Sequence, residues 1–113
     1  MNDAEVRQRF LLLAEELRVA AWIGLGRLKD PQSGAAEPNL DLARHAIDTL
    51  GMLEVKTRGN RDEVEERALR QMLADLRITY VEAAKAQAGP VGQGGTGAGA
   101  NTEDPAPAAE PGD

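Results

Sequence analysis

The residues best suited to hold a metal ion are Asp41, His45 and Asp48, which are spaced at i, i+4 and i+7. On a helix this spacing brings the three side chains to one face, where two of them could share a metal. Metal sites in helical bundles, however, draw inward-facing ligands from several helices. This trio falls on a polar face, and His45 is the only histidine in the chain. We therefore interpret the trio as a solvated face and expect no metal or other cofactor.

Residues 92–97, GQGGTG, match the G-x-G-x-x-G pattern of dinucleotide-binding loops. Such a loop holds a pyrophosphate only where a strand leads into it and a helix N-terminus follows it. Here the end of a predicted helix precedes the glycines and a proline-rich segment follows them. We therefore reject a nucleotide site.

Nucleophilic catalysis has few candidate residues in this chain. There is no cysteine, which excludes disulfides, thiolate metal sites and cysteine nucleophiles together. Ser33 is the only serine, and it lies in a predicted turn, where a hydroxyl commonly bonds its own backbone. His45 lies on another element, and nothing in the sequence places a carboxylate to orient it toward Ser33. We therefore expect no enzymatic activity.

Composition divides the chain into a folded domain, residues 1–88, and a tail, residues 89–113. The tail carries seven of the 12 glycines and four of the six prolines, and it has no lysine or arginine. Since such a segment cannot form an apolar core, we predict that it is disordered. Its four acidic residues account for −4 of the formal net charge of −6, which leaves −2 for the domain. The domain has no basic stripe, which argues against nucleic-acid binding.

The N-terminal sequence MNDAEVRQRF is charged from Asp3 onward and does not resemble a secretory signal. Within the predicted helices, the longest uncharged run, residues 19–26, is far shorter than the roughly 20 residues that cross a bilayer. We therefore predict a cytoplasmic protein without a membrane span. The acidic side chains of Glu15 and Glu16 also argue against attachment of the first helix to anionic lipid.

The first helix is expected from Asp3 to Lys29, where Asp30-Pro31 would end it. Its main apolar seam steps by four and three residues and comprises Val6, Phe10, Leu13, Leu17, Ala20 and Gly24. A second apolar line lies on another side of the same helix, with an aromatic residue near it. These candidate interface residues are Leu12, Val19, Trp22 and Ile23. A helix that covers one side of a small bundle needs one stripe, so two stripes indicate packing from both sides.

The second and third helices are expected to form an antiparallel hairpin. Residues 40–57 follow the N-cap Asn39 and end near Gly59, which is typical of a left-handed helix cap. The third helix is expected over residues 61–87. Its start is indicated by Asn60 and Glu63, which have capping-box spacing. The apolar positions are Leu40, Ala43, Ala46, Ile47, Leu50 and Leu53 in the second helix, and Leu69, Leu73, Leu76, Tyr80 and Ala83 in the third.

The predicted fold is an all-α three-helix bundle in which the long first helix packs on the hairpin. About 26 residues at about 1.5 Å each make the first and third helices about 39 Å long, and the second is only about 27 Å. The second helix therefore cannot cover both long partners. The uncovered length and the second stripe predict a symmetric homodimer, or pairing with another helical protein.

A longer set of residues, spread over two helices and the loops beside them, forms a specific pattern between residues 8 and 82. Its members are Leu25-Gly26, Pro31-Gln32-Ser33-Gly34, Asn39-Leu40, Ala43, Ile47-Asp48, Leu50, Met52-Leu53-Glu54, Lys56-Thr57, Gly59-Asn60, Glu65-Glu66, Leu69, Leu73, Asp75-Leu76-Arg77 and Tyr80-Val81. In this pattern the chain resembles a small bacterial family catalogued as domain of unknown function family eighteen forty-four. It departs from the family at Gly51, Val55 and Arg61, where the family has alanine, an acidic residue and an apolar residue. The resemblance implies the helical fold and brings no activity, cofactor or catalytic residue.

Three functions remain open from the sequence. The first is a homo-oligomeric interaction module whose first helix docks against itself or a partner helix, with the tail as a solubilising spacer. The second is a binding protein or enzyme accessory that takes a small apolar ligand between the first two helices, near residues 30–38. The third is peripheral membrane attachment. We favour the first, because the apolar excess lies on the first helix.

Overall fold

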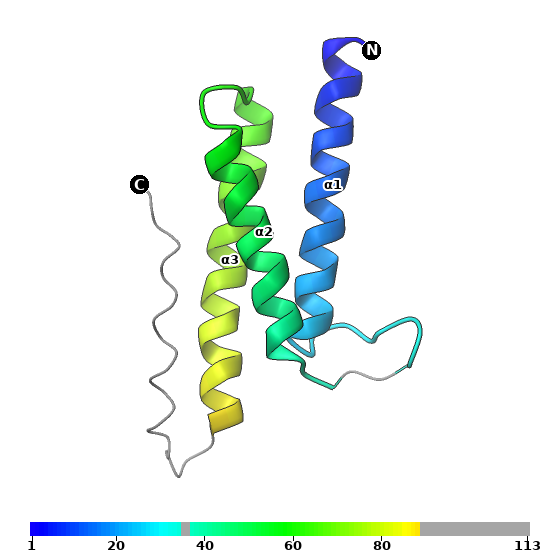
Figure 1. Cartoon of the computed structure of the whole chain (residues 1–113), viewed down its shortest axis with the longest axis vertical. Helices are drawn as coiled ribbons and strands as arrows, with labels where there is room; N and C mark the ends of the chain where they lie inside the picture. Colours follow the sequence, from blue (N-terminus) through cyan, green and yellow to red (C-terminus); the bar gives the residue numbers. More distant parts are fainter. Residues whose placement is uncertain (35–36, 89–113) are drawn as a thin grey trace.

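The structure, a computed structural model, describes residues 1–34 and 37–88 (Figure 1). Helix α1 spans Asp3–Gly24, α2 spans Leu40–Lys56 and α3 spans Glu63–Ala88. These described ranges contain no strand, and all three helices contact one another. The predicted all-α three-helix fold is therefore confirmed. The predicted disorder of residues 89–113 and the glycine pattern at 92–97 lie outside the described residues.

Helix α1 begins with a capping box and ends earlier than predicted. The Asn2 side chain accepts a hydrogen bond from the Glu5 backbone N–H at 2.8 Å, and the Glu5 carboxylate accepts one from the Asn2 N–H at 2.9 Å. The predicted end at Lys29 is wrong, because Gly26 takes a left-handed conformation with φ 77°. The N–H groups of Gly26 and Arg27 then donate back to the carbonyls of Ile23 and Trp22. This is a Schellman motif, and it stops α1 at Gly24.

The turn between α2 and α3 confirms one predicted cap and corrects another. Gly59 has φ 83°, as the left-handed prediction requires. The capping box of α3, however, uses Asp62 and Glu65 in place of Asn60 and Glu63. The Asp62 carboxylate accepts from the Glu65 N–H, and the Glu65 carboxylate accepts from the Asp62 N–H, both at 2.8 Å. The Asn60 N–H donates to the Thr57 carbonyl at 2.8 Å, which places Asn60 within the turn.

The core combines large residues of α2 and α3 with small residues of α1. The buried apolar residues are Ala14, Ala21, Leu25, Ala43, Ala46, Ile47, Leu50, Leu69, Leu73, Leu76 and Ala83. The arcs predicted for the second and third helices match this core. The seam predicted for the first helix is partly wrong, because Val6 and Leu13 are exposed while Ala14 and Ala21 are buried. Small residues lie here because they let α1 and α2 approach closely.

Helices α1 and α2 come closest at the end of α1 (Figure 1). A Cβ atom added to Gly24 would lie 2.5 Å from the backbone nitrogen of Ala43 and 2.8 Å from the carbonyl oxygen of Asn39. The Asn39 N–H also donates to the Gly24 carbonyl at 2.7 Å. The N-cap of α2 is therefore fixed directly against the last turn of α1.

Candidate interaction surface

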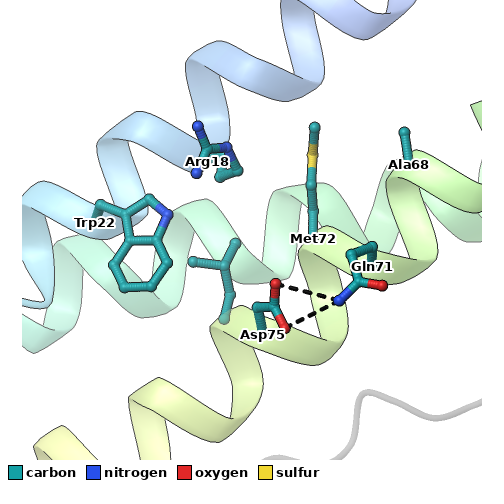
Figure 2. A pocket seen from close by; sticks show the side chains of 7 residues that line it. Arg18, Trp22, Ala68, Gln71, Met72 and Asp75 are labelled. Atoms are coloured by element: carbon teal, nitrogen blue, oxygen red, sulfur yellow. Dashed lines mark hydrogen bonds between the residues drawn. The ribbon is translucent and has the colours of Figure 1, made fainter.

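The four predicted interface residues do not lie on one surface. Leu12 is 54% exposed, whereas Val19, Trp22 and Ile23 are half-buried. At about 3.6 residues per turn, Leu12, Val19 and Ile23 lie on the side of α1 opposite its buried alanines. Trp22 instead points toward α3 (Figure 2). The structure therefore separates the aromatic residue from the aliphatic line that it was predicted to join.

Trp22 lies in a groove of about 290 Å³ between α1 and α3 (Figure 2). The lining residues are Arg18, Trp22, Ala68, Gln71, Met72, Asp75 and Leu76. Trp22, Met72 and Leu76 form its apolar part. On the rim, the Gln71 side-chain amide donates to the Asp75 carboxylate oxygens at 3.2 and 3.4 Å. The groove can accept an apolar group beneath a polar edge.

The charge of Arg18, at the edge of the groove, is paired within α1. Its Nε donates to a carboxylate oxygen of Glu15 at 2.9 Å, and Nη2 donates to the other oxygen. The hydrogen bond from Arg18 holds the pKa of Glu15 below its usual value of 4.5. Because both partners lie on the same helix and are part-exposed, the pair fixes the Arg18 side chain and contributes little to stability. The groove edge therefore offers no unpaired guanidinium to an anionic ligand.

Arg61 is the residue whose role sequence analysis missed, because it was noted only as a departure from an apolar family position. Its side chain is 5% exposed. Nη1 donates to the Glu54 carbonyl at 2.6 Å and to the Thr57 hydroxyl at 2.9 Å, and Nε donates to the Glu66 carboxylate at 2.8 Å. The guanidinium thus joins the C-terminus of α2 to the first turns of α3. The hydrogen bond from Arg61 is also the main reason that the pKa of Glu66 is lowered.

A second ion pair joins α1 to the start of α3. The Arg7 Nε donates to the Asp62 carboxylate at 2.6 Å. The pKa of Asp62 lies below its usual value of 3.8, first because the Glu65 backbone N–H donates to the carboxylate and then because Arg7 does. A carboxyl whose pKa is lower in the folded chain stabilises the fold above its unfolded pKa, and this contribution is lost as the pH falls through the folded pKa.

We expect the free energy of unfolding to fall as the pH is lowered from about 5 through 3.8 and below, with part of the loss arising at Asp62. Asp62→Asn should show a smaller fall, because asparagine can still accept from the Glu65 N–H but does not titrate. Urea unfolding at several pH values measures both chains. Asp48→Asn is the control. Among the described residues, the Asp48 carboxylate has only a long ion pair, at 3.9 Å from the Arg44 side chain. Equal falls in the wild type and Asp62→Asn would contradict the assignment.

The residues that the sequence analysis considered for metal binding or catalysis do not gather into one site among the described residues. Asp41, His45 and Asp48 are exposed on α2, and Ser33 is exposed in the turn at residues 31–33. Within residues 1–34 and 37–88, no three or more histidine, aspartate or glutamate side chains gather in a way that could hold a metal ion. A search of the same residues finds no helix with the length and apolar character needed to cross a bilayer.

Comparison with known proteins places the chain in a family but adds no characterised relative. No curated protein and no solved structure matches it. The family described as "Domain of unknown function (DUF1844)" matches residues 7–82. That range covers α2 completely, the α2–α3 turn, and most of α1 and α3. Since the match extends over more than half of the chain, this protein belongs to the DUF1844 family.

Proposed function

We propose that this domain is a cytoplasmic, homo-oligomeric interaction module without catalytic activity. One observation carries the proposal: α1 exposes three large apolar side chains. Val6 is 50% exposed, Leu12 is 54% exposed and Leu13 is 45% exposed. Removing apolar surface from water contributes about 25 cal/mol per Å², so covering these side chains favours association.

The helix that carries these side chains is held in place from both ends. Near its start, Arg7 bonds Asp62, which caps the N-terminus of α3, and at its end Gly24 packs against Ala43 of α2. A helix held in this way loses little conformational freedom when a partner docks on it.

We expect the wild-type chain to dimerise with increasing concentration, and Leu12→Asp to shift the equilibrium toward a folded monomer. An aspartate at Leu12 would place a charge on a surface that the dimer desolvates, at a cost of about 2 kcal/mol or more. Light scattering across a concentration series measures the absolute mass of each chain, and circular dichroism shows whether each is folded.

The matched control is Ile78→Asp, because Ile78 is 61% exposed on α3. This variant should dimerise like the wild type. Equal dissociation by the two variants would show that any added acidic residue disrupts association, and α1 would have no special role. A wild type that remains monomeric at every concentration would overturn the proposal.

A second candidate function is binding of a small apolar ligand, which the groove beside Trp22 favours. The sequence placed this ligand between the first two helices. At the closest approach of α1 and α2, however, Gly24 lies directly against the backbone of Ala43. The groove beside Trp22 lies between α1 and α3, and residues 35–36 of the predicted site lie outside the described residues. A chain that stays monomeric in the light-scattering experiment would make this groove the better candidate site.

A further inference from the structure

Four exposed residues of α1 form one continuous face in its first half. Arg9, Leu12, Leu13 and Glu16 follow the spacing i, i+3, i+4 and i+7, which places them on the same side of a helix. All four are exposed in the single chain. Two leucines therefore lie at the centre of this face, with a positive charge on the side of the helix N-terminus and a negative charge on the other.

The two charges of this face have no role within the fold. Neither Arg9 nor Glu16 forms an ion pair or a side-chain hydrogen bond with any residue that the structure describes. Their neighbours differ, because Arg7 bonds Asp62 at the N-cap of α3, and Glu15 and Arg18 bond each other. The central leucines likewise leave about half of their surface in water. The face is thus set apart from the parts of α1 that the bundle uses.

Two copies of this face are complementary in charge when they run in opposite directions. In a two-fold symmetric interface, contacts come in pairs. Where residue i of one copy contacts residue j of the other, residue j of the first copy also contacts residue i of the second. If two α1 helices lie antiparallel about an axis between Leu12 and Leu13, Arg9 of each copy faces Glu16 of the other. The four leucines of the two copies then lie around the axis. Parallel pairing would instead bring like charges together, at Arg9 and again at Glu16.

We propose that α1 pairs antiparallel with α1 of a second copy of this chain, through Arg9, Leu12, Leu13 and Glu16. This inference rests on the proposed homo-oligomeric function and names its surface and orientation. Two helices that meet over about two turns bury less than the roughly 1,200 Å² of a standard interface, so the dimer is weak. We expect a dissociation constant on the order of micromolar, tuned by the two reciprocal ion pairs.

Charge reversal tests the orientation of the helices. Each of the single variants Arg9→Glu and Glu16→Arg places like charges opposite each other twice and should weaken the dimer about tenfold. The double variant Arg9→Glu with Glu16→Arg restores both opposite-charge pairs. It should dimerise within about threefold of the wild type, since the exchanged pairs have similar geometry. Sedimentation equilibrium of the full chain gives the dissociation constants.

Two checks separate association from folding. Arg67→Glu, on the exposed side of α3, is the charge-reversal control and should leave the dimer unchanged. Arg9→Gln and Glu16→Gln remove each charge without reversing it, and should each weaken the dimer about threefold. Circular dichroism of every variant confirms that α1 still forms.

The outcomes distinguish this inference from the function on which it rests. A wild-type dimer that is unaffected by both single reversals would overturn the antiparallel pairing and leave the homo-oligomeric function standing. The same conclusion would follow from a double variant as weak as the single ones. A wild type that never dimerises would overturn both proposals. Weakening by each single variant together with recovery in the double variant would support the pairing.

Discussion

Gly24→Ala is expected to lower the free energy of unfolding by about 2 kcal/mol. The new Cβ would lie 2.5 Å from the nitrogen and 2.9 Å from the Cα of Ala43, and 2.8 Å from the Asn39 carbonyl oxygen. All three atoms belong to the backbone, so α2 must move as a whole or lose its first turn. Forcing atoms into a packed site costs about 3 kcal/mol here, and the better helix propensity of alanine returns about 1 kcal/mol.

Gly51→Ala is the matched control, because it introduces the same methyl group within α2. The nearest atom to its Cβ would be the Nη2 of Arg77, at 3.4 Å, which is the mobile end of a long side chain. We expect this variant to be more stable than the wild type by about 0.5–1 kcal/mol, through helix propensity alone. Urea unfolding measures both variants. A Gly24→Ala chain as stable as Gly51→Ala would show that α1 and α2 are not in such close contact.

Arg61→Ala is expected to destabilise the domain by about 2–3 kcal/mol, since hydrogen bonds to a charged group contribute about 1.5–3 kcal/mol. The variant removes the donor to the Glu54 carbonyl, which lies in the last turn of α2, and the donor to the Thr57 hydroxyl. It also leaves the Glu66 carboxylate without its main partner. Both sides of the α2–α3 turn lose support at once.

Arg70→Ala is the control for this substitution, because Arg70 contacts the same Glu66 carboxylate at 3.0 Å. Its side chain is largely exposed, and such surface pairs contribute about 0–1 kcal/mol. Arg61→Leu should lose less stability than Arg61→Ala, because leucine refills the buried volume. Urea unfolding at neutral pH compares the three variants. Similar losses for Arg70→Ala and Arg61→Ala would show that Arg61 acts only through Glu66.

The sequence predicted helix starts and stops where one local signal was decisive. Asn39 and Gly59 stand alone at their positions, and both act as predicted. At the end of α1, two stop signals compete. The predicted end rests on Asp30-Pro31 alone, but Gly26 comes first along the chain, and its left-handed backbone allows two hydrogen bonds that end the helix.

The start of α3 and the buried face of α1 depend on contacts between distant residues. Asn60 and Asp62 each have an acidic residue three positions later, so spacing alone cannot choose between them. Asp62 is favoured in the fold because Arg7 of α1 bonds it. The apolar seam placed Leu13 in the core because it fits the four-and-three spacing of the apolar residues along the first helix. The close contact with α2 instead selects small residues such as Ala14.

The candidate site was predictable only in part. Leu12 is exposed, and its position opposite the buried alanines of α1 follows from helix periodicity, but its place in an interface stays a prediction. The position of Trp22 does not follow in this way, because its groove is completed by α3, about 50 residues further along the chain. The charges at Arg9 and Glu16 gave no signal in the sequence, since only the fold shows which neighbouring charges are already paired.

The hydrogen bond from the Asn39 N–H to the Gly24 carbonyl has a consequence for how the loop between α1 and α2 can change. This bond joins the two ends of the loop at 2.7 Å, whatever lies between them. The entropy of closing a flexible loop grows slowly with its length, by about 0.6 kcal/mol for each doubling. Insertions between Gly26 and Pro38 therefore cost the bundle little. This loop is where the domain can gain length, and with it new binding surface, without changing its three helices.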